Sequence, residues 1–186
     1  MKVLVIPEDP TLDQYILKPI VGRIFADLGR PSSRINVLTN PRLRGVTQAL
    51  DGAILKDVVE TYPMVDLFLV LVDRDGETRR PAVARRREAE QEGRLFVCLA
   101  IEEIEVWMLA VHREALGVTW SEVRSEIHPK ERFAQPFLKD NAPKLDPGAG
   151  RAWAMRDLGA RWKGVLQCCS EIDELRRRIE QWLAER

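Results

Sequence analysis

The sequence predicts an α/β protein built on a parallel sheet of about four strands, with helices on both faces and a helical C-terminal extension. The first reason is that short apolar runs alternate with helical patterns four times before Ala115. The second is the run Asp66–Val72 (DLFLVLV), which is apolar without alternation. Such a run is typical of a strand that is buried on both faces, as strands of parallel sheets are. The connections between these strands are expected to be right-handed crossovers.

Each expected strand is a short run rich in β-branched and other apolar residues. The four strands are predicted at Lys2–Ile6, Arg34–Thr39, Asp66–Val72 and Arg94–Ala100. Helices are expected where apolar residues recur at intervals of three and four. They are predicted at Thr11–Leu28, Gly45–Thr61 and Glu102–Ala115, and a polar helix is predicted at Pro81–Glu92. Thr11 is expected to cap the first helix, with Asp13 in its first turn and Pro19 implying a kink or a late start.

The pattern changes after Gly117, where several prolines separate short helical pieces. A final amphipathic helix is predicted at Ser170–Ala184. We therefore expect a core of residues 1–116 and a helical extension of residues 117–186 that packs on this core, within a single domain.

Composition excludes several classes of protein. Lysine plus arginine and aspartate plus glutamate both number 29, and this balance neither favours nor excludes nucleic acid. No apolar run approaches the about 18 residues that a membrane-spanning helix needs, and the N-terminus shows no signal-peptide pattern. The three cysteines have no disulfide spacing and lie apart from the two histidines. These features predict a cytoplasmic protein without a membrane segment or a structural zinc site.

Functional groups of an open parallel sheet collect beyond the carboxyl ends of its strands. Acidic residues follow three of the four expected strands. They are Glu8, Asp9 and Asp13 after the first strand, Asp73 and Asp75 after the third, and Glu102, Glu103 and Glu105 after the fourth. Crowded carboxylates repel one another unless a cation lies between them. Because the ligands are oxygens, the sequence predicts a hard divalent cation rather than zinc, with Mg²⁺ or Mn²⁺ expected.

Spacing selects among these acids. Asp73 and Asp75 flank a single residue, so they project to the same side of an extended strand end. On the expected helix, Glu102 shares a face with Glu105, and Glu103 points elsewhere, toward solvent. The predicted metal ligands are therefore Glu8, Asp9, Asp13, Asp73, Asp75 and Glu102.

Each of these acids also has an ordinary structural interpretation. Asp-x-Asp-Gly after a strand is often only a turn. Acids in the first turn of a helix are stabilised by the helix dipole, and acids in loops are often solvated. The agreement of three strand ends favours the metal site over these alternatives.

Several basic residues lie close enough in sequence to bind phosphate groups beside such a metal. Arg79, Arg80 and Arg44 are the predicted nucleic-acid-binding residues. The run Arg85–Arg87 is interpreted instead as a solvated helix face, balanced by acids of the same helix. Lysines of the proline-rich stretch could also reach the site, and the sequence selects none of them: Lys130, Lys139 and Lys144.

Three segments together resemble a bacterial family of Toprim-like proteins, which is related to the nucleases of the overcoming-lysogenization-defect type. The segments are Pro7–Pro19 (PEDPTLDQYILKP), Leu69–Gly76 (LVLVDRDG) and Ala100–Ala110 (AIEEIEVWMLA). The resemblance covers nearly the whole chain. It implies a Toprim fold, in which an acidic residue follows the first strand and Asp-x-Asp follows a later one.

The resemblance also implies roles for individual residues. Asp13 matches an acid that lies a short step into the first helix of the related nucleases. Glu102 matches a glutamate that follows a small residue and any residue, with Ala100 in place of the usual serine. Toprim domains usually carry glycine after the first glutamate, whereas Asp9 follows Glu8 here, so either acid could take that role. The catalytic lysine of those nucleases has no single counterpart in this sequence.

The acids and the resemblance together predict a divalent-metal-dependent phosphodiesterase or nuclease that acts on DNA or RNA. Glu8 and Asp73 are the predicted catalytic residues, with Glu8 either a metal ligand or a general base. The resemblance further implies bacterial defence beside a partner ATPase. Two alternatives stay open: a non-catalytic module that binds nucleic acid or a partner protein, and phosphoryl or nucleotidyl transfer to a small molecule. The oligomeric state is also open, a homodimer included.

Overall fold

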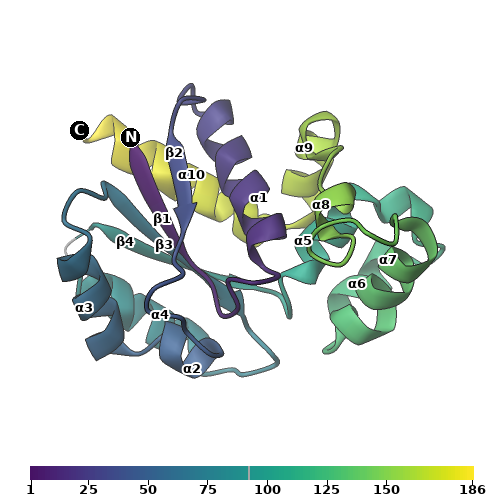
Figure 1. Cartoon of the computed structure of the whole chain (residues 1–186), viewed down its shortest axis with the longest axis horizontal. Coiled ribbons are helices and arrows are strands. Elements are labelled where there is room, and N and C mark those ends of the chain that lie inside the picture. Colours follow the sequence, from purple (N-terminus) through teal and green to yellow (C-terminus); the bar gives the residue numbers. More distant parts are fainter. Residues whose placement is uncertain (92) are drawn as a thin grey trace.

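The computed structural model describes residues 1–91 and 93–186 and has the predicted α/β architecture (Figure 1). In that part of the chain, four parallel strands form a sheet in the order β2-β1-β3-β4. The strands are β1 (Lys2–Ile6), β2 (Arg34–Val37), β3 (Leu67–Asp73) and β4 (Leu95–Ala100). All four coincide closely with the predicted segments, so the predicted parallel sheet is confirmed.

Strand β3 shows why its sequence lacks alternation. Its leucines belong to one hydrophobic cluster, and the residues between them belong to a second cluster on the opposite face. Every side chain from Leu67 to Val72 is buried as a result. A strand that is covered on both faces needs apolar residues at every position.

Helices cover both faces of the sheet, as predicted (Figure 1). One face is covered by α1 (Gln14–Asp27) and α10 (Ser170–Ala184). Helices α5 (Glu105–Val111) and α9 (Leu158–Cys168) belong to the same hydrophobic cluster and pack against α1 and against each other. The opposite face packs against α2 (Val46–Ala49), α3 (Gly52–Thr61) and α4 (Arg80–Ala89).

The C-terminal extension is helical, as expected, and follows α5 and a short 3₁₀-helix, η1 (Arg113–Ala115). Before α9 and α10 it contains α6 (Trp120–Ser125), the π-helix η2 (Lys130–Ala134), α7 (Gln135–Asn141) and α8 (Arg151–Ala154). Val123, Leu138 and Trp162 of the extension belong to the same hydrophobic cluster as Val3 and Leu67 of the sheet. Within the described residues, no helix has the length and apolar character that crossing a membrane requires.

The start of α1 differs from the prediction. The helix begins at Gln14 rather than near Thr11, so Thr11 is not its cap and Asp13 precedes the first turn. The reason is a local turn, in which Asp9 Oδ1 accepts a hydrogen bond from the N–H of Thr11 over 2.8 Å. A side chain that satisfies nearby backbone groups in this way competes with helix formation.

Two further helix boundaries also differ. The segment predicted as one helix at Gly45–Thr61 is two helices, because Asp51 caps α3 by accepting a hydrogen bond from the N–H of Ile54 over 3.0 Å. The helix predicted from Glu102 begins only at Glu105, so the two acids before it lie in a loop.

Candidate metal centre

The carboxyl ends of β1 and β3 meet at Glu8 and Asp73. The register pairs Ile6 of β1 with Val70 of β3, which places Glu8, two residues beyond its strand, beside the end of β3. The backbone N–H of Asp73 donates a hydrogen bond to Glu8 Oε1 over 2.7 Å. The two predicted catalytic residues are therefore direct neighbours.

Three carboxylates converge just beyond this point, and we call them the carboxylate centre: Asp73, Asp75 and Glu103. One oxygen of each lies within 4.8 Å of the other two. Asp75 and Gly76 have φ values of 46° and 64°, which form a left-handed turn directly after β3. The backbone N–H of Ile104 donates to Asp73 Oδ1 over 2.8 Å and fixes that carboxylate. Hard oxygen ligands from separate elements suit a divalent cation.

The loop between β4 and α5 delivers Glu103 to the centre, where the sequence indicated Glu102. The prediction that Glu102 and Glu105 share a helical face is wrong, since the helix begins at Glu105. Glu102 instead forms an ion pair with Arg74 and accepts a backbone N–H from the turn after β3. The prediction that Glu103 points to solvent is also wrong, because its side chain is 7% exposed and joins the two aspartates.

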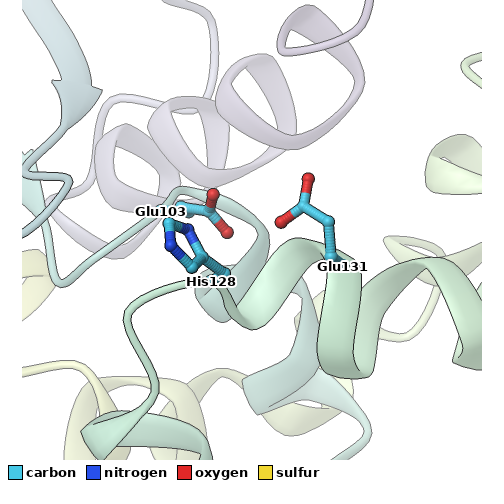
Figure 2. A group of neighbouring side chains, drawn as sticks. All are labelled: Glu103, His128 and Glu131. Atoms are coloured by element: carbon cyan, nitrogen blue, oxygen red, sulfur yellow. The ribbon is translucent and has the colours of Figure 1, made fainter.

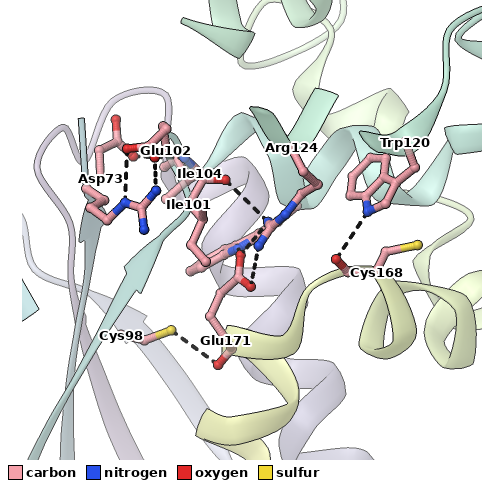
Figure 3. A network of polar contacts seen from close by, with 11 residues as sticks. Asp73, Cys98, Ile101, Glu102, Ile104, Trp120, Arg124, Cys168 and Glu171 are labelled. Atoms are coloured by element: carbon pink, nitrogen blue, oxygen red, sulfur yellow. Dashed lines mark hydrogen bonds and ion pairs between the residues drawn. The ribbon is translucent and has the colours of Figure 1, made fainter. Parts of the chain in front are cut away.

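The C-terminal extension fixes the loop that carries these two glutamates (Figure 3). Arg124 of α6 donates to the carbonyl oxygen of Ile101 over 3.3 Å and forms an ion pair with Glu171 of α10 at 2.8 Å. Glu171 also accepts a hydrogen bond from the indole N–H of Trp107 in α5 over 3.0 Å. Helices α5, α6 and α10 therefore meet at this loop, and the positions of its acids depend on all three.

Asp9 and Asp13 form a further acidic pair close to Glu8. The backbone N–H of Asp9 donates to Asp13 Oδ2 over 3.0 Å. Burial is the main cause that raises the pKa of Asp13 to about 7; the hydrogen bond from Asp9 opposes the rise, and the charges of Glu105, Asp9 and Glu8 add to it. The structure thus brings both predicted ligands near the carboxylate centre without making them members of it.

Negative charge at the centre is only partly compensated. Burial raises the pKa of Asp73 to about 9, and the charges of Glu8 and Glu105 contribute to the rise. Burial is also the main cause that raises the pKa values of Glu8 and Glu103. Carboxyl groups that resist ionisation in this way are stabilised as carboxylates when a cation binds between them.

Three basic side chains reach this cluster of acids. Arg80 donates to Asp75 Oδ2 over 2.6 Å. Arg151 forms a buried ion pair with Glu105 at 2.7 Å, and Lys130 Nζ lies 3.7 Å from the same carboxylate. The charge of Glu105 raises the pKa of Lys130, which keeps this ammonium group protonated. Among the lysines that the sequence left undecided, Lys130 reaches the site.

Sequence reasoning named Glu105 and Lys130 without selecting either, and it missed Arg151. The available signal was α5 itself (EVWMLAV), whose apolar residues on all sides indicate a buried helix. A glutamate within such a helix, here 1% exposed, needs a cationic partner. That partner could not be identified, because Arg151 lies 46 residues further along the chain.

The predicted nucleic-acid-binding arginines occupy two different environments. Arg80 is held by Asp75 and also donates to the carbonyl oxygen of Asp73 over 2.8 Å, so it forms part of the site. Arg44 and Arg79 are exposed, and neither forms an ion pair within residues 1–91 and 93–186. Their guanidinium groups are accessible to a ligand.

The arginine run of α4 is only in part a solvated helix face, because Arg87 is 18% exposed and donates to the carbonyl oxygen of Leu50 over 2.7 Å, and Glu88 pairs with Arg178 of α10. Arg86 and Arg87 both pair with Glu90, at 3.0 and 2.9 Å. Arg85 is exposed. Glu92, which the sequence assigned to the same helix, lies outside the described residues.

Comparison with known proteins assigns no family to this arrangement. No protein-family model, curated protein or solved structure matches the chain. The function is therefore argued from the chemistry of the site.

Proposed function

We propose that this protein is a divalent-metal-dependent phosphodiesterase that cleaves nucleic acid. The observation that carries the proposal is the convergence of Asp73, Asp75 and Glu103, with oxygens within 4.8 Å, at the carboxyl edge of a parallel sheet. The resemblance of the sequence to Toprim-like proteins supports the same activity. That resemblance also supports, as parts of the proposal, a role in bacterial defence and a partner ATPase.

The donor set fits Mg²⁺ or Mn²⁺. Asp73, Asp75 and Glu103 would hold the ion through carboxylate oxygens, with the acids of the segment between β1 and α1 close by. The carboxylates of this partly buried cluster repel one another when ionised, which is the reason that a cation fits. When bound, such an ion supplies Lewis-acid stabilisation of phosphoryl oxygens and lowers the pKa of water.

The side chains around the centre supply the remaining chemistry. Glu8 lies beside Asp73, and burial is the main cause that raises its pKa. It is therefore placed to accept a proton from the attacking water. Lys130 stays protonated and stabilises negative charge on the phosphate. The exposed guanidinium groups of Arg44 and Arg79 bind neighbouring phosphates of the strand.

A non-catalytic nucleic-acid-binding module is the second candidate. The observation that favours it is the pairing of Asp75 with Arg80 at 2.6 Å, which already compensates one carboxylate of the centre. In addition, Glu102, the residue that matches the glutamate of the related nucleases, is engaged with Arg74. A site compensated in this way would retain nucleic acid without hydrolysing it.

Cleavage of labelled single- and double-stranded DNA and RNA in Mg²⁺ or Mn²⁺ tests the proposal. The variants are Asp73→Asn and, as a matched control, Asp140→Asn on the exposed side of α7. We expect cleavage by the wild type and the control, and a loss of about 100-fold or more in Asp73→Asn. Retention of nucleic acid without cleavage would support the binding module. A folded, metal-loaded protein that neither cleaves nor retains any substrate would contradict both candidates.

A further inference from the structure

A second group of ligating side chains lies where the C-terminal extension reaches the carboxylate centre. It consists of Glu103 from the loop before α5, His128 from the segment before η2, and Glu131 from the first turn of η2. One ligating atom of each lies within 4.8 Å of the other two. Figure 2 shows the carboxylates of Glu103 and Glu131 turned toward a common space, with the imidazole of His128 beside Glu103.

Backbone hydrogen bonds fix the positions of these residues relative to one another. The N–H of Lys130, which lies between the two extension residues, donates to Glu103 Oε2 over 2.7 Å. The N–H of Arg132 donates to the carbonyl oxygen of His128 over 3.1 Å, so the histidine is fixed to the start of η2. The buried glutamate and the π-helix therefore form one unit, although 25 or more residues separate them along the chain.

The nearby cations do not neutralise this group. The ammonium of Lys130 is directed to Glu105, and the guanidinium of Arg132 is paired with Glu126. Within residues 1–91 and 93–186, the side chains of His128 and Glu131 form no hydrogen bond or ion pair, and Glu103 Oε1 receives no donor. Glu103 is 7% exposed and is held through Oε2, while its Oε1 has no protein donor in the described part of the chain and faces the exposed side chains of His128 and Glu131.

We infer that Glu103, His128 and Glu131 form a second divalent-cation site, distinct in ligand chemistry from the carboxylate centre. One imidazole and two carboxylates suit Mn²⁺, Co²⁺ or Zn²⁺ better than Mg²⁺, because Mg²⁺ strongly prefers oxygen ligands. Glu103 belongs to both groups and would bridge the two ions. The inference goes beyond the proposed function, since it requires binding of a metal at this site and not hydrolysis.

Pulsed electron paramagnetic resonance on the Mn²⁺-loaded, tag-free protein tests this site. A coordinated imidazole gives a nitrogen modulation that carboxylates cannot give. The chain has two histidines, and the ring of the other, His112, bonds through Nε2 to the carbonyl oxygen of Ala154 over 2.7 Å. We expect the nitrogen modulation in the wild type and in the control Asp140→Asn, and its loss in His128→Gln.

Counting bound Mn²⁺ by equilibrium dialysis gives an independent result. Even the loss of a residue that only hydrogen-bonds to a metal ligand weakens metal binding by about 10- to 100-fold. Loss of a direct ligand in Glu131→Gln or His128→Gln should therefore lower the Mn²⁺ affinity of this site by about tenfold or more. The other site should remain occupied. Asp75→Asn should do the reverse, removing the ion of the carboxylate centre while the nitrogen modulation persists.

The outcomes separate this inference from the proposed function. A wild type that binds Mn²⁺ without nitrogen modulation, and loses that ion in Asp75→Asn, would overturn the second site and leave the carboxylate centre standing. Nitrogen modulation that persists in His128→Gln would also overturn it. A folded protein that binds no Mn²⁺ at all would overturn both sites.

Discussion

Asp73 is a carboxyl group that its surroundings keep from ionising at neutral pH. Burial, followed by the charges of Glu8 and Glu105, raises its pKa from 3.8 to about 9. Since the pKa is higher in the folded than in the unfolded chain, the folded state binds this proton more tightly. The resulting stability is fully present below pH 3.8 and is lost as the pH rises toward 9.

Asp73→Asn should therefore stabilise the metal-free protein at alkaline pH. Asparagine keeps an oxygen that can accept the N–H of Ile104, but it carries no charge. In EDTA, we expect the free energy of unfolding of the variant to exceed that of the wild type by at least about 1 kcal/mol near pH 8, and the two to converge near pH 4. Urea unfolding at several pH values measures this difference. A variant with the wild-type pH dependence would show that Asp73 ionises normally.

Glu105 and Arg151 form the most deeply buried ion pair near the site, at 2.7 Å and with both side chains at most 5% exposed. Among the described residues, removing Arg151 leaves the buried charge of Glu105 with only the ammonium of Lys130, at 3.7 Å, as a partner. We expect Arg151→Met to lower the free energy of unfolding by about 3–5 kcal/mol. The exposed pair of Arg177 and Glu174 gives the control, since Arg177→Met should cost less than about 1 kcal/mol. Urea unfolding measures both losses. Equal losses of unfolding free energy in Arg151→Met and Arg177→Met would contradict the larger contribution of the buried pair.

At the scale of elements, the strands and the final helix Ser170–Ala184 were predictable, whereas the starts of α1 and α5 were not. Runs such as Lys2–Ile6 and Asp66–Val72 are apolar enough to be strands without any tertiary information. The parallel order then brings their acidic ends together, which is why Glu8 and Asp73 could be placed correctly. Whether Glu102 or Glu103 joins the carboxylate centre depended on where α5 begins, which the sequence did not predict correctly.

The start of α5 is set by contacts that no local pattern reveals. The preceding loop is held by Arg124 and Glu171, which come from the C-terminal extension. Lys130 enters the site by the same route. Local sequence therefore predicted that a carboxylate cluster forms, but its membership depends on residues that only the tertiary structure brings close.

Glu171→Gln tests whether the extension positions the loop. Glutamine can still accept the indole N–H of Trp107, but it loses the ionic part of the bond to Arg124. We expect a loss of about 1–3 kcal/mol in stability, together with weaker Mn²⁺ binding at the carboxylate centre. The control Glu174→Gln changes an exposed acid of the same helix. A Glu171→Gln variant with wild-type metal affinity would limit this network to a role in stability.

At the scale of the whole molecule, the sheet and the extension share one hydrophobic cluster. Trp162 and Trp182 of the extension are buried together with residues of β1, β3 and α1. Helix α10 of the extension packs against β4, and α9 packs against α1, α5 and α10 (Figure 1). The segments between α6 and α9 supply Lys130 and Arg151 to the site.

A chain that ends at Leu116 should consequently fail to fold. Truncation would expose the sheet face that α10 covers and the faces of α1 and α5 that α9 covers, and it would leave Glu105 without Arg151. We expect loss of cooperative thermal unfolding and binding of a hydrophobic dye, compared with the full chain by circular dichroism and fluorescence. A truncated chain that unfolds cooperatively would show that residues 1–116 form an independent unit.

The central claim is that the carboxyl edge of the sheet holds a divalent cation, and anomalous diffraction from crystals grown with Mn²⁺ tests it most directly. The account predicts an anomalous peak within coordination distance of Asp73, Asp75 and Glu103. The carboxylate of Asp75 would then either leave Arg80 or bind both Arg80 and the ion. A well-ordered site without a peak, in which Asp75 remains bound to Arg80 alone, would contradict it.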